Sequence, residues 1–161
     1  MIEAVEAAKK SARDNMQMFL RNFSHVPDDK LHWTPAPTAK SALRIAAHTA
    51  LYYSRFAKMI RDRKPPQPED LELWIAQNNA EEEAITTREQ VIQAFNMGLE
   101  EVISALETIQ ADEVDSEIDS GQGWTMPMWF MMNLPGWHAT LHCGQIDYLQ
   151  TCWNDQEIYV G

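Results

Sequence analysis

The sequence predicts an all-α fold, an antiparallel four-helix bundle with a long crossover between the second and third helices. Four stretches of roughly twenty residues place apolar side chains at alternating spacings of three and four, the pattern of a helix with one buried face. No stretch alternates apolar and polar residues in the way of a half-buried strand. The 161 residues suffice for a substantial core, so we expect a single domain over residues 1–161.

The first two predicted helices have clear ends. Apolar residues recur at helical spacing from Ile2 to Phe23, and a proline with two aspartates closes this helix. The second helix is expected over residues 42–63, with Ser41 as its N-cap and a run of prolines after it. Its apolar stripe includes His48, which is therefore expected to point toward the core.

The link to the third helix is long. Residues 67–86 lack a clean period, so we expect a crossover with one short helix around residues 71–83, whose three consecutive glutamates, Glu81 to Glu83, form a solvated face. The third helix has the clearest stripe, from Ile92 to Ile109. Thr86 followed by Glu89 is typical of a capping box at its start.

The fourth helix is expected from near Gly123 to about Trp153, with a kink or a restart at Pro135-Gly136. Its first half is dense in methionine and aromatic residues. A Cu(I) site is one interpretation, but such residues more often fill gaps in a core or between subunits. We therefore hypothesise that this segment forms the face of a homodimer.

The composition excludes several classes of function. The net charge is −11, from 24 acidic against 13 basic residues, which repels phosphate backbones and argues against nucleic-acid binding. The basic cluster from Arg55 to Lys64 is interpreted as charge at a helix C-terminus. Cys143 and Cys152 lie too far apart on one predicted helix to pair, and no apolar leader or membrane span is present. These features favour a cytoplasmic protein that does not bind membranes.

Three of the five histidines form the main candidate site. His138 and His142 are four residues apart, so their imidazoles share one face of the fourth helix, and His48 lies on the inward stripe of the second. Burying three imidazoles without partners is unfavourable, which favours a shared divalent metal over three separate core residues. Three neutral nitrogens suit Zn²⁺ or Ni²⁺ and leave coordination positions for water or substrate.

The other candidate groups have simpler explanations. His25 and His32 are expected in exposed loops, Cys143 is turned away from the histidine face, and Cys152 is expected to be a small buried residue. The chain has no glycine-rich phosphate loop, no nucleophile motif and no carboxylate pair at catalytic spacing. Without a metal, no part of the sequence indicates chemistry.

Two segments around these histidines resemble the DinB-like family, also described as bacillithiol transferase-like. The first is LHWTPAP at residues 31–37, followed by Ser41 and His48; the second is HATLHCGQI at residues 138–146. The resemblance implies a four-helix bundle with a long crossover and a metal bound by His48, His138 and His142. One departure is Cys143, which stands where many relatives carry a further histidine or arginine.

Neighbouring residues are candidates for supporting roles. Gln145, inside the second segment, is expected to orient a metal ligand or its water, and Gly144 to permit close helix packing. Arg44 and Tyr52 lie one turn before and one turn after His48, where they are candidates to bind a substrate anion or to donate a proton.

The resemblance implies a metal-dependent enzyme of the thiol S-transferase or hydrolase kind. In such an enzyme the metal activates the thiol of a low-molecular-weight cofactor, or a water, for reaction with a small-molecule substrate. The alternative is a non-catalytic, stress-related helical bundle, a dimer in which the ion pins the second helix to the fourth. Plain helix packing without a metal is the third interpretation.

Overall fold

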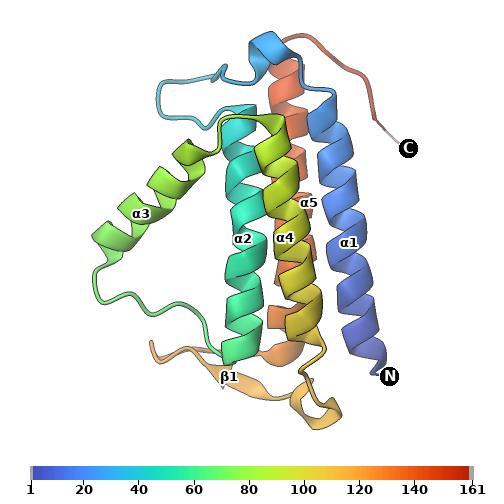
Figure 1. Cartoon of the computed structure of the whole chain (residues 1–161), viewed down its shortest axis with the longest axis vertical. Coiled ribbons are helices and arrows are strands. Elements are labelled where there is room, and N and C mark those ends of the chain that lie inside the picture. The colour runs from blue at the N-terminus through green and yellow to red at the C-terminus, as the bar shows by residue number, and fades with distance from the viewer. Residues whose placement is uncertain (1, 160–161) are drawn as a thin grey trace.

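The computed structural model describes residues 2–159, and these residues are mostly helical. Four long helices lie side by side, and a shorter one stands out from them (Figure 1). A small two-stranded antiparallel sheet closes one end. The elements are α1 (Glu3–Ser24), α2 (Ala42–Asp62), α3 (Leu71–Ala84), α4 (Arg88–Leu106), β1 (Glu117–Asp119), β2 (Thr125–Pro127) and α5 (Met128–Cys152), with short 3-10 turns at Asp28–Lys30 and Ala111–Glu113.

The crossover decides how the long helices run. Residues 63–87, which include α3, return along the outside of α2, so α4 begins at the same end as α2 and runs in the same direction (Figure 1). α1 and α5 run together in the opposite direction. α2 packs mainly on α4 and α1 on α5, while the contact between α2 and α5 joins the two pairs. That contact positions the candidate site.

The core is built by the apolar faces that the sequence pattern predicts. Tyr53 of α2 is fully buried, its ring meets Phe95 of α4 at 5.2 Å, and its hydroxyl donates to the carbonyl of Ala12 in α1 at 2.9 Å. One side chain thus joins three helices and has its polar atom satisfied. Phe19 of α1 reaches the same cluster at 5.4 Å from Phe95.

Helix ends follow the predicted chemistry with one shift in register. Ser41 caps α2, because its hydroxyl accepts from the backbone N–H of Arg44. The capping box of α4 is formed by Thr87 and Gln90, one residue after the predicted pair of Thr86 and Glu89. Both pairs have a threonine followed three residues later by a side chain that can accept a hydrogen bond, and the structure uses the later pair.

The start of the last helix differs from the prediction. Residues 117–127 form the β1–β2 hairpin, and α5 begins at Met128 rather than near Gly123. The hairpin loop contains Gly121 and Gly123, both with positive φ (69° and 84°), which suits glycine in a tight turn. Of the predicted kink or restart at Pro135-Gly136, the restart is wrong, because α5 continues through Pro135 as one helix.

Several single residues also differ from the prediction. Ile92 is 44% exposed, because the buried position at that turn of α4 belongs to Val91. Cys152 is exposed at the end of α5 instead of buried, and both cysteines are free thiols. Gly144 does not mediate close packing, since a Cβ there would meet nothing within 4 Å.

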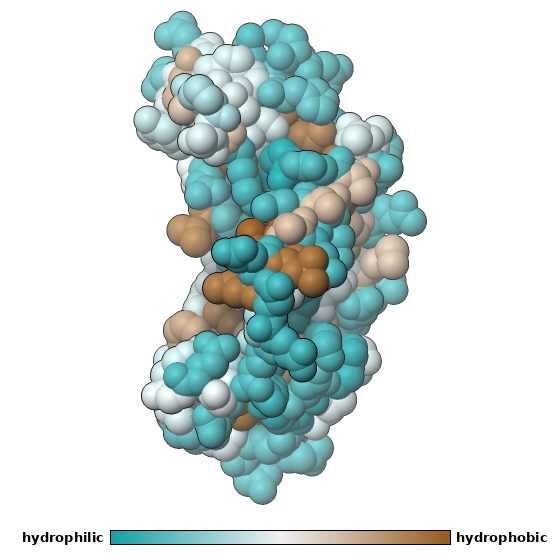
Figure 2. All heavy atoms as spheres, turned by 90° about the vertical axis from the view of Figure 1, so that its left-hand side faces the viewer, coloured by the Kyte–Doolittle hydropathy of each residue, from teal (hydrophilic) through white to brown (hydrophobic). Residues whose placement is uncertain are grey.

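α3 lies against α2 at its C-terminal end, and the rest of this helix is largely exposed. Figure 2 views the molecule from the side on which α3 lies and shows a mostly polar face with apolar atoms near its middle. Three apolar side chains of α3, Leu71, Leu73 and Ile75, are between 46% and 58% exposed.

Among the described helices, none has the length and apolar character needed to cross a membrane.

At Gly98, α4 lies close against α2, which gives a test of the packing. A Cβ at position 98 would lie 2.6 Å from Cβ of Tyr53, which cannot move without disturbing the core. We expect Gly98→Ala to lower the free energy of unfolding by about 1–2 kcal/mol, despite the better helix propensity of alanine. Gly144→Ala, which meets no neighbour, is the matched control and should be neutral or stabilising by up to about 1 kcal/mol in the same urea titration. Equal effects of both substitutions would contradict this packing.

Candidate metal centre

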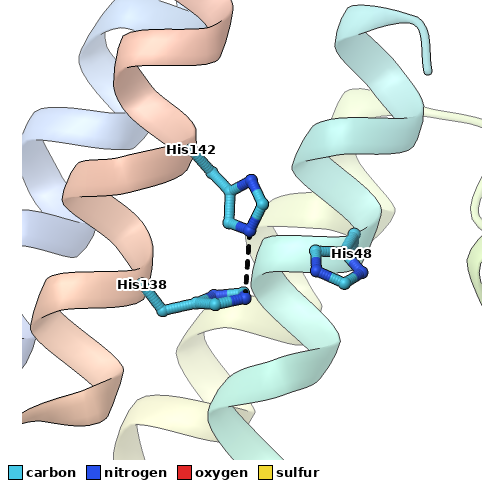
Figure 3. A group of neighbouring side chains, drawn as sticks. All are labelled: His48, His138 and His142. Carbon is cyan, nitrogen blue, oxygen red and sulfur yellow. Dashed lines mark hydrogen bonds between the residues drawn. The ribbon is translucent and has the colours of Figure 1, made fainter. Parts of the chain in front are cut away.

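His48, His138 and His142 come together at the contact between α2 and α5. Figure 3 shows the two α5 imidazoles reaching toward the imidazole on α2. Nε2 of His142 lies 3.0 Å from Nε2 of His138, and the His48 ring centroid lies 4.8 Å from that of His142 and 5.1 Å from that of His138. One nitrogen from each residue can be chosen so that all three lie within 4.8 Å of one another. The residues are half-buried.

Two of the three rings are held at the nitrogen that faces away from the cluster. Nδ1 of His48 lies 2.6 Å from Oε1 of Glu82, and Nδ1 of His142 lies 2.7 Å from Oε1 of Gln145. Because a carboxylate and an amide oxygen accept hydrogen bonds, each Nδ1 carries the proton and donates. The Nε2 lone pairs of His48 and His142 are then free for a ligand.

Glu82 is a site residue that the sequence analysis missed. Its side chain is 2% exposed, whereas the triple glutamate was predicted to be a solvated face. Oε1 accepts from His48, and Oε2 accepts from Nζ of Lys40 at 2.7 Å and from the Arg44 guanidinium at 3.3 Å. Its neighbours Glu81 and Glu83 remain exposed. The prediction was wrong for Glu82 because the last turn of α3 lies across α2.

The cations around Glu82 keep it ionised. Burial alone would raise the pKa of this carboxyl, but the hydrogen bonds from His48 and Lys40 and the positive charge of Lys40 outweigh the burial and hold the pKa at about 2. At neutral pH the Nδ1 proton of His48 therefore faces a full negative charge. Such a partner fixes the tautomer and the orientation of a metal-binding imidazole.

Aromatic rings form the floor of the cluster. Tyr52 stacks on His138 with ring centroids 4.9 Å apart, and Phe56 meets the same imidazole edge-on at 5.1 Å. Burial among these rings, followed by the charges of the neighbouring histidines, lowers the pKa of His138 to about 2. Burial also lowers the pKa of His142. Both rings are therefore neutral at pH 7, as metal ligands must be.

A pocket of about 540 Å³ opens beside the histidines. Its walls come from the loop before α2, from α2 itself and from the second half of α5, and they are mostly apolar, with His48, His142 and Gln145 among the polar members. A small molecule in this pocket lies against two of the three imidazoles. The pocket is of the size that ligand sites usually have.

The predicted supporting residues all lie near the cluster. Gln145 contacts His142 and Tyr52 contacts both His48 and His138. The Arg44 guanidinium pairs with Glu82 and, at 2.7 Å, with Glu83. Its role as an anion binder stays a prediction, and these two carboxylates leave less of its charge for a ligand.

Cys143 lies on the other side of α5, as the helical spacing predicted. Its Sγ accepts from the side-chain amide of Asn22 in α1 at 3.2 Å. Burial raises the pKa of this thiol to about 11, so it stays protonated at neutral pH and is a poor nucleophile. His25 and His32 are exposed, as expected.

The three histidines fit a divalent ion. One nitrogen from each ring lies within 4.8 Å of the other two, the outer nitrogens of His48 and His142 have acceptors, and neutral imidazole is the form that coordinates Zn²⁺ or Ni²⁺. The buried Nδ1 of His138 has no partner among the described residues. In the metal-free protein one of the two facing Nε2 atoms donates to the other at 3.0 Å, and a bound cation would take the place of that proton.

Comparison with known proteins agrees with this arrangement at the level of the fold. A family model of the DinB superfamily matches residues 10–146. A DinB-like protein from Bacillus subtilis superposes with a TM-score of 0.63 at 16% identity, covering 97% of this chain and 96% of that one. An uncharacterised protein from Escherichia coli UTI89 gives a TM-score of 0.64 at 11% identity, with 95% and 96% covered.

An enzyme is also among the similar structures. The mycothiol-dependent maleylpyruvate isomerase has a TM-score of 0.66 at 13% identity. The match covers 88% of this chain and 60% of the isomerase, so part of that enzyme has no counterpart in the match. No curated protein sequence matches the chain. At these identities the likeness shows a common fold.

The buried neutral histidines predict how stability depends on pH in metal-free protein. In the folded chain His138 has a pKa of about 2, against 6.5 ordinarily, so below pH 6.5 the unfolded chain binds a proton that the folded chain does not. Stability should therefore fall between pH 7 and pH 5, by up to about 1.4 kcal/mol per pH unit from this residue, and His142 adds to the same slope. Urea unfolding at pH 7, 6 and 5 measures the slope. His138→Gln should flatten it, and an unchanged slope in that variant would show that His138 is not buried as a neutral group.

Proposed function

The chain belongs to the DinB superfamily, and from this premise we propose that it is a divalent-metal-dependent enzyme of the thiol S-transferase or hydrolase kind. The observation that carries the proposal is the convergence of three imidazoles at the edge of an apolar pocket, with the outer nitrogens of two rings held by Glu82 and Gln145. A purely structural metal site would be closed by a fourth protein ligand, whereas three ligands leave a position open.

His48, His138 and His142 are the proposed ligands, with Zn²⁺ or Ni²⁺ as the ion that suits three nitrogens. A bound ion of this kind supplies Lewis acidity, which lowers the pKa of a thiol or a water that reaches it. Glu82 holds the His48 ring and Gln145 holds the His142 ring, so neither ligand has to reorient when the ion enters. The aromatic floor of Tyr52 and Phe56 excludes water from one side of the site.

The neighbouring pocket is the proposed binding place of a low-molecular-weight thiol or of the small-molecule substrate. Its walls include Pro35, Ile45 and Leu149, which suit an apolar electrophile or the carbon skeleton of a thiol. The similar fold of a mycothiol-dependent isomerase supports the thiol, and the substrate of that enzyme is not transferred to this chain.

The helical bundle, the cell compartment and the oligomeric state belong to the same proposal. The four long helices are taken as the bundle of this superfamily, and the chain as a single cytoplasmic domain that acts as a homodimer. The aromatic side chains Trp129, Phe130 and Trp137 of α5 are 37–44% exposed and touch one another, which suits a subunit contact. A monomer at micromolar concentration in sedimentation would remove the dimer.

His142→Ala tests the metal and the activity together. Elemental analysis should find stoichiometric Zn or Ni in the wild-type protein and none in the variant, because two imidazoles on separate helices hold an ion poorly. Low-molecular-weight thiols should react with a generic electrophile faster in the presence of the metal-loaded wild type than in the presence of the variant. His25→Ala, at an exposed loop histidine, is the control and should keep metal and rate. Unchanged metal content in His142→Ala would contradict the proposed metal site. A wild-type protein that binds metal but shows no thiol-transfer or hydrolytic activity would favour the non-catalytic bundle.

Glu82→Gln separates orientation from ligation. The amide keeps the size of the side chain but lacks the charge that faces the His48 Nδ1 proton, so metal affinity should fall by about 10–100-fold. Glu83→Gln removes the same charge from an exposed neighbour and should change affinity less than about twofold. Competition with a chromogenic chelator measures both. Equal affinities of the two variants would mean that Glu82 does not position the ligand.

A further inference from the structure

A second pocket lies between α2 and α3, away from the histidines. It has a volume of about 390 Å³ and is lined by the last turns of α2, by the prolines that follow and by Trp74 of α3. α3 lies close to α2 at its C-terminal end and diverges from it toward its N-terminal end (Figure 1). The function proposed above makes no use of this pocket.

The charge of the lining is opposite to that of the molecule. Three basic side chains, Arg55, Lys58 and Lys64, line the pocket against one acidic side chain, Asp62, although the whole chain has a net charge of −11. Lys58 pairs with Asp62, but both side chains are exposed and such pairs are weak. Three of the five basic residues that the sequence analysis assigned to a helix end therefore line a cavity, where positive charge attracts anions.

Arg55 is the best-placed of these groups. Its side chain is 18% exposed, and its guanidinium is held on one side only, by Glu81 at 2.7 Å from Nη2. The other terminal nitrogen, Nη1, is buried and has no acceptor among the described residues. A guanidinium prefers two parallel hydrogen bonds to one carboxylate or phosphate. Glu81 supplies one and is 61% exposed, so an entering anion can displace it and, after a small rotation of the guanidinium, satisfy both nitrogens.

The rest of the pocket suits a flat apolar group. Trp74 and the run Pro65-Pro66 provide large apolar surfaces, and Met59 lines the same space. Ligand sites commonly combine such walls with a few charged groups that fix orientation. A small inorganic anion would leave this apolar surface unused.

One aromatic ring separates the pocket from the histidines. The guanidinium carbon of Arg55 lies 4.7 Å from the Tyr52 ring centroid, and the Tyr52 ring lies 4.3 Å from the His48 ring and 4.9 Å from the His138 ring. The guanidinium of Arg55 and the histidine cluster therefore lie on either side of the Tyr52 ring.

We propose that the pocket between α2 and α3 binds the anionic end of a small organic molecule, a carboxylate or phosphate carried on a flat apolar body. Arg55 is the principal anchor, Lys58 and Lys64 add charge, and Trp74 packs on the body. Naming this molecule as the substrate rests on the proposed function. The binding itself requires no metal ion.

Calorimetry on the metal-free full-length protein tests the binding, with benzoate and phenyl phosphate as anionic probes and benzamide as the neutral probe of the same shape. An anionic probe should bind about tenfold more tightly than benzamide, and Arg55→Met should abolish this difference. Glu81→Gln should tighten the binding by about two- to fivefold, because it removes the competing carboxylate at an exposed position. Inorganic phosphate, which lacks the apolar body, should bind more weakly than phenyl phosphate.

Arg61→Met is the matched control, since Arg61 is exposed, does not line the pocket and carries the same charge as Arg55. It should leave the anionic probe's affinity within about twofold. Three results would each overturn the proposal: benzamide binding as tightly as the anionic probes, Arg61→Met losing as much affinity as Arg55→Met, or Glu81→Gln showing no gain in affinity. The Glu81 variant decides the matter even if Arg55→Met folds poorly. Preference for benzoate or for phenyl phosphate identifies the anion. If the protein binds the probes but no metal, the pocket proposal stands and the proposed function fails. If it binds metal but none of the probes, the proposed function stands and the pocket proposal fails.

Discussion

A carboxylate stays charged away from water only where cations and N–H groups surround it, and the site depends on one such carboxylate, that of Glu82. Its two oxygens face His48 on one side and Lys40 and Arg44 on the other. Removing a single partner from a buried ionic group leaves the remaining charge uncompensated, so the cluster forms as a whole. The same contacts fasten the last turn of α3 to α2, set the tautomer of His48, and engage the Arg44 guanidinium.

α2 contributes a different group on each successive turn of one face. Ile45 lines the apolar pocket, His48 belongs to the histidine cluster, Tyr52 forms part of its floor, and Arg55 lines the basic pocket. Because a helix advances about 1.5 Å per residue, these groups have fixed separations. The helix therefore spaces the functional groups, and α5 and α3 cover them from two sides.

The sequence was sufficient for the features that depend on local spacing. The three histidines, the Ser41 cap and the apolar stripe of α1 all follow from positions three and four residues apart, and the structure has each of them. Glu82 could not be found in this way, because its burial results from how α3 folds back over α2. A signal was present in retrospect: Arg44 and His48 share one face of α2, Lys40 lies just before that helix, and three such groups close together need a counter-charge.

The hairpin was missed for a different reason. β1 and β2 are three residues each, too short to show alternation, and Gly123 in their turn was attributed to the start of a helix. The local pattern near Gly144 also misled, since its identity suggested close packing while the close approaches occur at Gly98 and Gly136. Which helix faces a glycine is a property of the tertiary arrangement, and no spacing along the chain reveals it.

The pairing of α1 with α5 has a consequence for the order of assembly. α1 is made long before α5, the helix on which it mainly packs, so much of its apolar stripe stays uncovered until α5 has been made. Contacts between such distant segments slow folding relative to helical proteins built from neighbours. His138 and His142 lie on α5, so the histidine cluster can form only once α5 has been made. A nascent chain therefore has no complete site at which to capture an ion prematurely.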